Sequence, residues 1–338
     1  MSETKEQSLT IRPLAPDDLP SVIALDAAIQ GHSRRTYVER RLAAALRDPA
    51  LHVQFAVQHA GRLAGYILAR VLQGEFGRTE ASLRLELIGV RADARRLGAG
   101  GKLLEALAQW ASRHGIHEIR TSAPWGDAPM LGWLRAMGFR LAPDIVLGMA
   151  VAQAPASEDP VVTLPHGHGF GQETDFGAPE ANDHERMARG SAEVRPMTAA
   201  DLQEILRVDR AITGRDRSGY IRARFDEALE DSTIHVSLVG RIDGAIVCFV
   251  MARADLGDFG RTQPAAVLDT IGVDPEYAHR GLGRALVSRL FEYVSQLQAT
   301  RVETLVKVAD LELLGFFQGI GFVPTQRLVF VRDTGAEG

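Results

Sequence analysis

"VLDTIGVDPEYAHRGLGRALVSRL" runs from Val267 to Leu290 and changes character midway. An apolar, β-branched run ends at Val273, a short polar stretch follows, and a glycine turn then leads into an amphipathic pattern. This order predicts a strand, a turn and a helix. The segment "LRLELIGVRADARRLGAGGKLLEAL", from Leu83 to Leu107, follows the same order, so the chain uses the unit twice.

Four short motifs recur at a constant offset of 183 residues. They are Ile11-Arg12-Pro13 with Val194-Arg195-Pro196, Phe76–Thr79 with Phe259–Thr262, Ile88–Val90 with Ile271–Val273, and Met137–Phe139 with Ile320–Phe322. A constant offset over the whole length indicates two copies of one fold. We therefore expect one domain over residues 1–150, a linker rich in Pro, Gly and acidic residues over 151–192, and a second domain over 193–338. We also expect the two domains to pack together as a pseudo-dimer.

The composition is that of an ordinary globular protein, with 338 residues of which 46% are hydrophobic and 24% charged. The net charge is −5 and neither copy is strongly basic, which argues against a nucleic-acid partner. No apolar run is long enough to cross a membrane and the N-terminus lacks a signal-peptide pattern, so we expect a cytoplasmic protein without a membrane partner. The lone cysteine, Cys248, lies in an apolar run and is predicted to be a buried hydrophobe rather than a nucleophile.

Within each copy the pattern predicts a strand, two helices, three strands, the glycine turn with its helix, a strand, a short helix and a final strand. Both copies resemble the Gcn5-related N-acetyltransferase (GNAT) superfamily. Its signature is a strand leading into Arg/Gln-x-x-Gly-x-Gly/Ala and a helix, followed later by Asn-x-x-Ala-x-x-x-Tyr-x-x-x-Gly-Phe. In the first copy Arg95-x-x-Gly98-x-Gly100 fits, and in the second Gly281-x-Gly283 fits while Ala278 replaces the leading Arg or Gln. The resemblance implies an α/β protein of two tandem GNAT-like domains, each a twisted mixed sheet flanked by helices.

The glycine turns are suited to binding an anion. Glycines let a turn wrap closely around a ligand, and the free amides and dipole of the following helix favour negative charge. The resemblance implies that the anion is the pyrophosphate of acetyl-CoA, the acyl donor, with its pantetheine between two splayed strands. The cofactor-binding residues expected in the first copy are Ile88, Gly89, Val90, Arg95, Arg96, Leu97, Gly98, Ala99, Gly100, Gly101, Lys102 and Asp127. In the second copy they are Ile271, Gly272, Val273, His279, Arg280, Gly281, Leu282, Gly283, Arg284 and Asp310.

Three other interpretations of the sequence are weaker. A glycine turn that merely starts a helix does not explain the doubled strand-to-helix context. A Rossmann nucleotide site would need a third glycine near Leu103 or Leu286 and an acidic residue ending the next strand. No metal ion is expected, because His166, His168 and His184 lack a further ligand at fixed spacing.

Glu86 and Asp269 are the candidate catalytic residues. Acyl transfer to an amine requires a neutral nucleophile, a polarised thioester carbonyl and a proton for the leaving thiolate. The two acids stand at equivalent positions, each four residues before the valine that ends its strand, so each is expected to share a strand face with that valine. We predict that they act as bases toward the amine, the alternative being that each pairs with a nearby arginine.

The sequence departs from the family pattern at the usual general acid. Leu134 and Phe317 occupy the Tyr position, and neither can donate a proton. Either another group donates it, or the thiolate leaves as such, or one copy is not catalytic. Tyr37 and Tyr220 also correspond to each other and are interpreted as packing residues, with a catalytic role as the alternative.

The function expected from these residues and the resemblance is acetyl-CoA-dependent N-acetylation of a primary amine of a small molecule, by direct attack on the thioester. A protein lysine or N-terminal amine is the alternative acceptor. A non-catalytic acyl-CoA-binding sensor or scaffold is the alternative from another class, and the absent tyrosines favour it.

Overall fold

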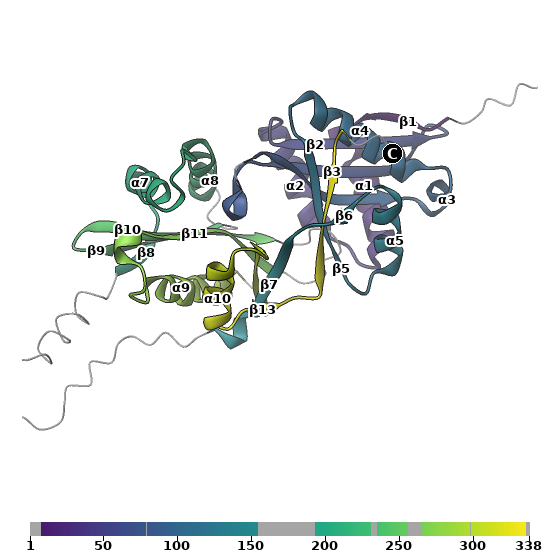
Figure 1. Ribbon diagram of the computed structural model, residues 1–338. Coiled ribbons are helices and arrows are strands. Elements are labelled where there is room, and N and C mark those ends of the chain that lie inside the picture. Colours follow the sequence, from purple (N-terminus) through teal and green to yellow (C-terminus); the bar gives the residue numbers. More distant parts are fainter. Residues whose placement is uncertain are drawn as a thin grey trace, which may run out of the picture.

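The computed structural model describes residues 8–78, 80–154, 193–230, 235–255, 265–297 and 299–335. Within them the chain forms two seven-stranded mixed sheets, each with helices on both faces (Figure 1). The predicted α/β class and the doubled fold are confirmed. Three features named from the sequence lie outside the described residues: the linker beyond Ala154, its three histidines, and the second repeat motif Phe259–Thr262.

The first sheet has the strand order β1-β2-β3-β4-β5-β14-β6. Helices α1 and α2 pack on one of its faces, and helices α4 and α5 on the other. Its elements are β1 (Thr10–Pro13), η1 (Pro16–Asp18), α1 (Leu19–Gln30), α2 (Arg35–Arg47), β2 (His52–His59), β3 (Arg62–Leu72), η2 (Glu75–Gly77), β4 (Ser82–Val90), α3 (Ala92–Arg95), α4 (Ala99–Arg113), β5 (Glu118–Pro124), α5 (Ala128–Ala136), β6 (Arg140–Leu141) and β14 (Arg327–Asp333).

The second sheet has the order β13-β7-β12-β11-β10-β9-β8. Figure 1 shows α7 and α8 on one side of it and α9 and α10 on the other. Its elements are β7 (Asp144–Ala150), η3 (Val151–Gln153), β8 (Glu193–Pro196), η4 (Ala199–Asp201), α7 (Leu202–Thr213), α8 (Ser218–Glu230), β9 (His235–Ile242), β10 (Ala245–Asp255), β11 (Ala265–Val273), η5 (Pro275–Tyr277), α9 (Leu282–Gln296), β12 (Arg301–Lys307), α10 (Leu311–Gly319) and β13 (Val323–Pro324).

Local sequence explains most of these elements. In α9 the buried residues Leu286, Leu290 and Val294 recur at helical spacing and pack on the second sheet. The β2–β3 hairpin turns at Ala60 and Gly61, both with positive φ, which matches the mirror-image turns that two-residue hairpin loops favour. Cys248 is fully buried in the core of the second sheet, as its apolar surroundings predicted.

The two copies exchange a strand. β7 belongs to the first copy by sequence but pairs antiparallel with β12 over the full length of both strands. In return β14, from the second copy, pairs in the same way with β5. Equivalent backbone hydrogen bonds hold the two crossings, from Ala142 N to Val329 O at 2.9 Å and from Thr325 N to Val146 O at 2.8 Å. Figure 1 shows yellow β14 lying beside the teal strands β5 and β6 of the first copy.

Each sheet is therefore completed by the other copy. The pattern predicted both strands but not their partners, because a half-buried strand has the same alternation whichever sheet it joins. The ranges 1–150 and 193–338 remain a prediction from the repeat, and each sheet takes strands from both of them. Neither copy is expected to form its full sheet alone.

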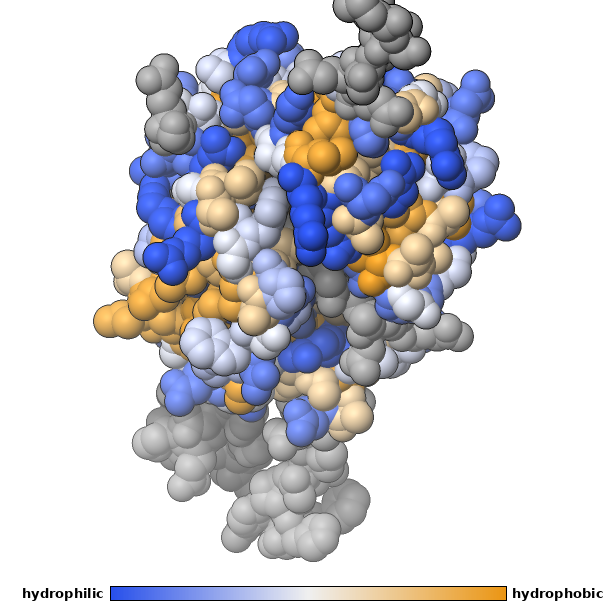
Figure 2. Space-filling view, turned by 90° about the vertical axis from the view of Figure 1, so that its right-hand side faces the viewer, coloured by the Kyte–Doolittle hydropathy of each residue, from blue (hydrophilic) through white to orange (hydrophobic). Residues whose placement is uncertain are grey.

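The molecular surface is mixed. Figure 2 shows hydrophobic patches interrupted by hydrophilic side chains on the face that it presents. None of the helices in the described ranges is both long enough and apolar enough to cross a bilayer.

Because of the strand exchange, a core substitution in one copy is expected to destabilise the sheet formed mainly by the other copy. Leu147, in β7, is buried in the core of the second sheet, and Phe330, in β14, in the core of the first. Truncating either to Ala should lower the free energy of unfolding by about 2–5 kcal/mol. In hydrogen exchange, Leu147→Ala should reduce amide protection in β11 and β12, and Phe330→Ala should reduce it in β4 and β5. Loss of protection confined to the copy that carries each substitution would contradict the exchange.

Candidate functional site

In both copies the strands expected to flank the cofactor separate soon after they pair. β4 and β5 run parallel and pair at Leu83 and Arg84, although β4 continues to Val90. β11 and β12 pair from Ala265 to Val267 and then separate, although β11 continues to Val273. The predicted segments Ile88–Val90 and Ile271–Val273 therefore lie beside an open strand edge. A ligand can hydrogen-bond to such an edge as an added strand does.

A threonine marks the point of separation in each copy. The hydroxyl of Thr121 donates a 3.1 Å hydrogen bond to the carbonyl oxygen of Leu85. The hydroxyl of Thr304 donates a 3.0 Å bond to the carbonyl oxygen of Leu268. Each hydroxyl satisfies a carbonyl that the separating strand no longer reaches. Sequence reasoning missed these residues, although their identity at the 183-residue offset could have revealed them.

Glu86 and Asp269 each occupy a β-bulge. β3 pairs Leu68 with Leu87 and Ala69 with Leu85, so Glu86 is the extra residue of β4. The same irregularity in β11 makes Asp269 the extra residue. Bulges recur next to active sites, where they redirect a side chain.

The bulge corrects the expected orientation of the two acids. Ile88 and Val90 pack toward α4, whereas Glu86 contacts Arg41 on α2, on the opposite face of the first sheet. The expectation that Glu86 shares a face with Val90 was therefore wrong, since the extra residue breaks the two-residue alternation. Asp269 is likewise displaced toward α8 in the second copy.

Glu86 is buried in an ion pair. Its carboxylate accepts a short bond from the guanidinium of Arg41, which also donates to the carbonyl oxygen of Ala69 at 2.7 Å. Burial by itself would raise the pKa of Glu86, but attraction to Arg41, His52 and Arg70 outweighs it and lowers that pKa. A carboxylate held in this way is a weak base, so the first copy follows the alternative of arginine pairing.

Asp269 has a different environment. Its Oδ2 lies 3.2 Å from Nε of Arg253, while its buried Oδ1 has no hydrogen-bond partner among the described residues. Tyr220 is only 4% exposed, and its hydroxyl also has no hydrogen-bond partner among the described residues. Burial, together with the carboxylates of Glu75 and Asp269, raises the pKa of Tyr220, so the phenol stays protonated. An unused carboxylate oxygen and an unused hydroxyl thus lie in one region of the second copy.

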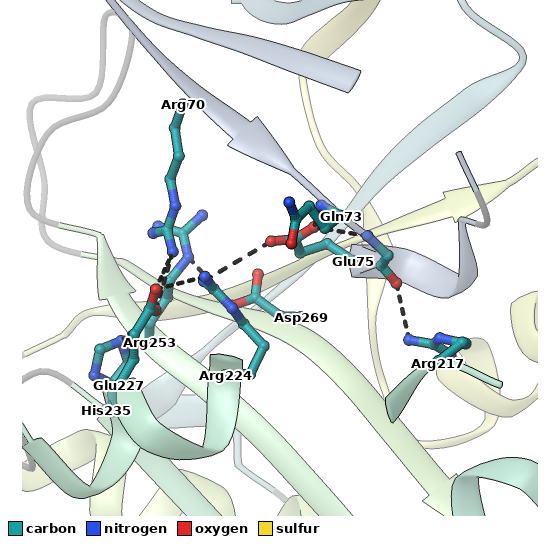
Figure 3. Close-up of polar contacts among 10 residues, drawn as sticks. Arg70, Gln73, Glu75, Arg217, Arg224, Glu227, His235, Arg253 and Asp269 are labelled. Carbon is teal, nitrogen blue, oxygen red and sulfur yellow. Dashed lines mark hydrogen bonds and ion pairs between the residues drawn. The ribbon is translucent and has the colours of Figure 1, made fainter. Parts of the chain in front are cut away.

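One substitution between the copies explains the difference. Arg224 is the counterpart of Arg41, but it donates to Glu227 at 2.5 Å instead of holding the strand acid. Glu227 also accepts two bonds from Arg70 of the first copy, at 2.7 and 3.0 Å. The position equivalent to Glu227 in the first copy is Ala44, so no carboxylate there competes for Arg41. Figure 3 shows Arg70 reaching Glu227 beside Arg224 and Asp269.

The glycine turns have free helix amides in both copies. Gly98 and Gly281 precede α4 and α9 in the left-handed conformation, with φ of +78° and +79°. The first backbone bonds of these helices run from Lys102 N to Gly98 O and from Ala285 N to Gly281 O. The three amides before each bond are left for a ligand, which fits the predicted anion site.

The second glycine of each turn has a packing role. A Cβ at Gly100 would lie 3.1 Å from the indole nitrogen of Trp133, and one at Gly283 would lie 2.8 Å from the ring of Phe316. These glycines let α5 and α10 approach the helices closely. From the sequence alone, both glycines were expected to contact the ligand.

The predicted cationic residues lie at the turns but not in matching conformations. In the first copy Arg95 ends the short helix α3 and donates to Val90 O at 3.1 Å. In the second copy His279 has a φ of +61°, and Arg280 stacks on Tyr277 at 5.0 Å. Arg284 donates to Gly319 O at 2.9 Å.

The residues that stand at the positions of the family's Asn and Tyr have structural roles in this chain. Asp127 and Asp310 each accept a 3.1 Å bond at the start of α5 or α10 and so act as helix N-caps. Leu134 and Phe317 are fully buried in the two cores. Neither copy has a proton donor at the usual place, as the sequence predicted.

A family model described as the acetyltransferase (GNAT) family matches residues 19–139 and again residues 200–322. An aminoglycoside N(6')-acetyltransferase type 1 from Serratia marcescens is 28% identical over 116 residues, which cover 33% of this chain and 79% of that protein.

Solved structures share the fold of the whole chain. A GCN5-related glucosamine N-acetyltransferase region of a fungal multi-domain β-N-acetylglucosaminidase matches with a TM-score of 0.64 and 14% identity. That match covers 97% of this chain but only 38% of the fungal protein. A tandem GNAT protein from the clavulanic acid biosynthesis pathway matches with a TM-score of 0.62 and 17% identity, covering 98% of this chain and 100% of that one.

The buried pair predicts a large, pH-dependent stability effect. Glu86→Gln leaves Arg41 as a buried charge without its counterion, which should lower the free energy of unfolding by about 3–5 kcal/mol at pH 7. Because the folded-state pKa of Glu86 is lowered, its stabilisation is present above the ordinary Glu pKa and is lost as pH falls through the folded value. Urea unfolding should therefore show the two proteins converging in acid.

The exposed pair between Arg35 and Glu39 provides the control. Glu39→Gln should change stability by less than about 1 kcal/mol. A similar small effect for Glu86→Gln would show that the buried pair contributes little.

Proposed function

The chain belongs to the acetyltransferase (GNAT) family, and on this premise we propose that its second copy transfers an acetyl group from acetyl-CoA to a primary amine of a small molecule. The observation that carries the proposal is the unused Oδ1 of Asp269 near the protonated hydroxyl of Tyr220. In the first copy the corresponding acid, Glu86, is held by Arg41.

The chain has suitable groups for acetyl-CoA at the second glycine turn. The free amides at the start of α9, with His279 and Arg280 beside them, would bind the pyrophosphate. The open edge of β11 over Ile271–Val273 would orient the pantetheine. When bound, acetyl-CoA supplies a thioester whose carbonyl carbon accepts the amine and whose thiolate leaves.

Asp269 would act on the acceptor. An alkyl amine is largely an ammonium ion at neutral pH and must lose a proton before it can attack. The unused Oδ1 of Asp269 would accept that proton, directly or through water. The hydroxyl of Tyr220 would donate a hydrogen bond to the acceptor and help to position it. We assign no general acid, because a thiol with an ordinary pKa can leave as the thiolate and be protonated by solvent.

A small amine is favoured over a protein amine as the acceptor. Tyr220 and Asp269 are both nearly fully buried, so the reacting group must enter an enclosed region. The Serratia marcescens relative is named for acetylation of an aminoglycoside, a small molecule that carries amino groups. Its likeness to this chain supports an acceptor of that size and charge.

The first copy would serve mainly as a structural and binding partner. Its strand edge and glycine turn keep the geometry for acetyl-CoA. Its strand acid, Glu86, is held in an ion pair by Arg41 and is therefore a weak base.

The equivalent acids provide a matched test. Asp269→Asn should lower the rate of amine-dependent thiol release about a hundredfold to ten-thousandfold, as expected for loss of a general base. Glu86→Gln, assayed under conditions where it is folded, should retain most of the activity. The Asp269→Asn defect should shrink as pH rises, since more of the amine is already neutral. Equal losses in both variants would contradict the assignment to the second copy, and thiol release that needs no amine would contradict N-acetylation.

The cofactor assignment has a test of its own. Arg280→Ala should weaken acetyl-CoA binding about tenfold to a hundredfold in calorimetry, because a charge-assisted contact to the pyrophosphate is lost. Arg289→Ala, about two turns further along α9, serves as the control and should leave affinity unchanged. Identical affinities for both variants would place the pyrophosphate elsewhere.

A further inference from the structure

A loop of the first copy enters the site of the second. Residues Gln73–Gly77 follow β3, and Glu75 at their centre is 2% exposed. The loop is held by a 2.8 Å bond from Arg217 Nη2 to the carbonyl oxygen of Gly74. Figure 3 shows Gln73 and Glu75 facing Arg224 and Arg217 of the second copy.

The backbone of this loop is shaped for the approach. Gly74 has a φ of +144°, and a Cβ there would lie 2.9 Å from the ring of Tyr220, so no larger residue fits without a shift. Phe76 has a φ of +57°, which is uncommon for a bulky residue. Strained backbone of this kind persists where surrounding contacts enforce it, frequently at ligand sites.

The carboxylate of Glu75 is oriented by its own loop. Its Oε2 accepts bonds from the backbone amides of Gln73 and Gly74, at 2.8 and 3.2 Å. Its Oε1 lies 3.8 Å from Nη1 of Arg224, beyond hydrogen-bond distance. Arg224 is bonded to Glu227 instead. Glu75 therefore presents a fixed, buried carboxylate whose second oxygen makes a 3.8 Å ion pair with Arg224 but no hydrogen bond to it.

Glu75 and Asp269 act on the same groups. Both carboxylates interact electrostatically with the phenol of Tyr220 and the guanidinium of Arg224. They come from different copies, and they have different partners, because Asp269 pairs with Arg253. The site of the second copy thus contains two acids with separate environments.

Two acids do not suit a single reacting amine. A base must take a proton from the amine, whereas a second carboxylate next to the same nitrogen would stabilise its ammonium form and oppose deprotonation. A fixed carboxylate in this position is useful when it binds another positive charge of the acceptor. The reacting amine and this second charge would then be distinguished by Asp269 and Glu75.

We propose that Glu75 of the first copy completes the acceptor site of the second copy, where it binds a second ammonium group of a small diamine or polyamine acceptor. This inference rests on the proposed function, since it takes Asp269 as the base for the reacting amine. Glu75 is a specificity-determining residue in this arrangement. The first copy then contributes to substrate recognition while the second carries out the transfer.

The test compares acceptors that differ in the second charge alone. Straight-chain diamines from diaminopropane to diaminohexane are assayed beside the monoamines from propylamine to hexylamine, with acetyl-CoA and the full chain. The wild-type protein should show a higher kcat/KM with at least one diamine than with the monoamine of equal length. Glu75→Gln should raise the KM for that diamine about tenfold to a hundredfold, because a charge-assisted contact is lost. It should lower kcat/KM for the monoamine of equal length by a clearly smaller factor, because that acceptor carries no second charge.

Two further variants control for structure. Glu80→Gln removes an exposed carboxylate in the same β3–β4 connection. It should change kcat/KM with neither the diamine nor the monoamine. Glu75→Asp keeps the charge and should retain part of the diamine preference. Thermal unfolding of each variant separates loss of recognition from loss of folding.

Three results would overturn the proposal. One is a wild-type protein that shows no preference for diamines, whether it acetylates both series or neither. Another is a Glu75→Gln variant that affects monoamines and diamines equally. The third is increased activity toward both series, which would show that the loop blocks the site. If Asp269→Asn abolishes turnover while Glu75→Gln has no effect on diamines, this inference fails and the proposed function stands.

Discussion

The reciprocal pairing of β7 with β12 and of β14 with β5 fixes the relation between the two copies. Each exchanged strand is hydrogen-bonded over its whole length and places apolar side chains, such as Leu147 and Phe330, in the other core. Breaking the arrangement would expose the edges of β5 and β12, and so an unpaired strand edge in both sheets at once. The copies therefore behave as one folded unit, and a loop of one can hold a defined position in the other.

Because the exchanged strands hold the two copies together, one fold can support two different sites. Both copies have the same strand separation, the same threonine at its start and a bulged acid. The single change from Ala44 to Glu227 draws Arg224 away from the strand acid, and Arg70 of the first copy holds Glu227 in place. In the second copy the strand acid pairs with Arg253 instead, and its Oδ1 is left without a hydrogen-bond partner among the described residues. The electrostatic difference depends on Glu227 within the second copy and on its contact with Arg70 of the first copy.

The arrangement in the second copy lowers the stability of the folded chain, as is common at functional sites. Tyr220 and Asp269 retain buried polar atoms without hydrogen-bond partners among the described residues, which destabilises a folded chain unless a ligand satisfies them. The β3–β4 loop adds backbone strain at Phe76 beside them. In the first copy the carboxylate of Glu86 contacts Arg41, although Nη1 of Arg41 and Nδ1 of His52 have no hydrogen-bond partner among the described residues either.

The sequence by itself determined the repeated fold, the order of elements and the place of the glycine turns, because these follow from local periodicity and a constant 183-residue offset. It also identified Glu86 and Asp269 as equivalent acids and excluded a proton donor at Leu134 and Phe317. It could not assign β7 and β14 to a sheet, since strand pairing is a long-range choice that leaves the same alternation in the sequence. It placed the acids on the wrong face because one extra residue in a bulge reverses the alternation. The pair between Asp269 and Arg253 depends on the register of two strands of the second copy, and the entry of Glu75 into the surroundings of Asp269 depends on contact between the two copies.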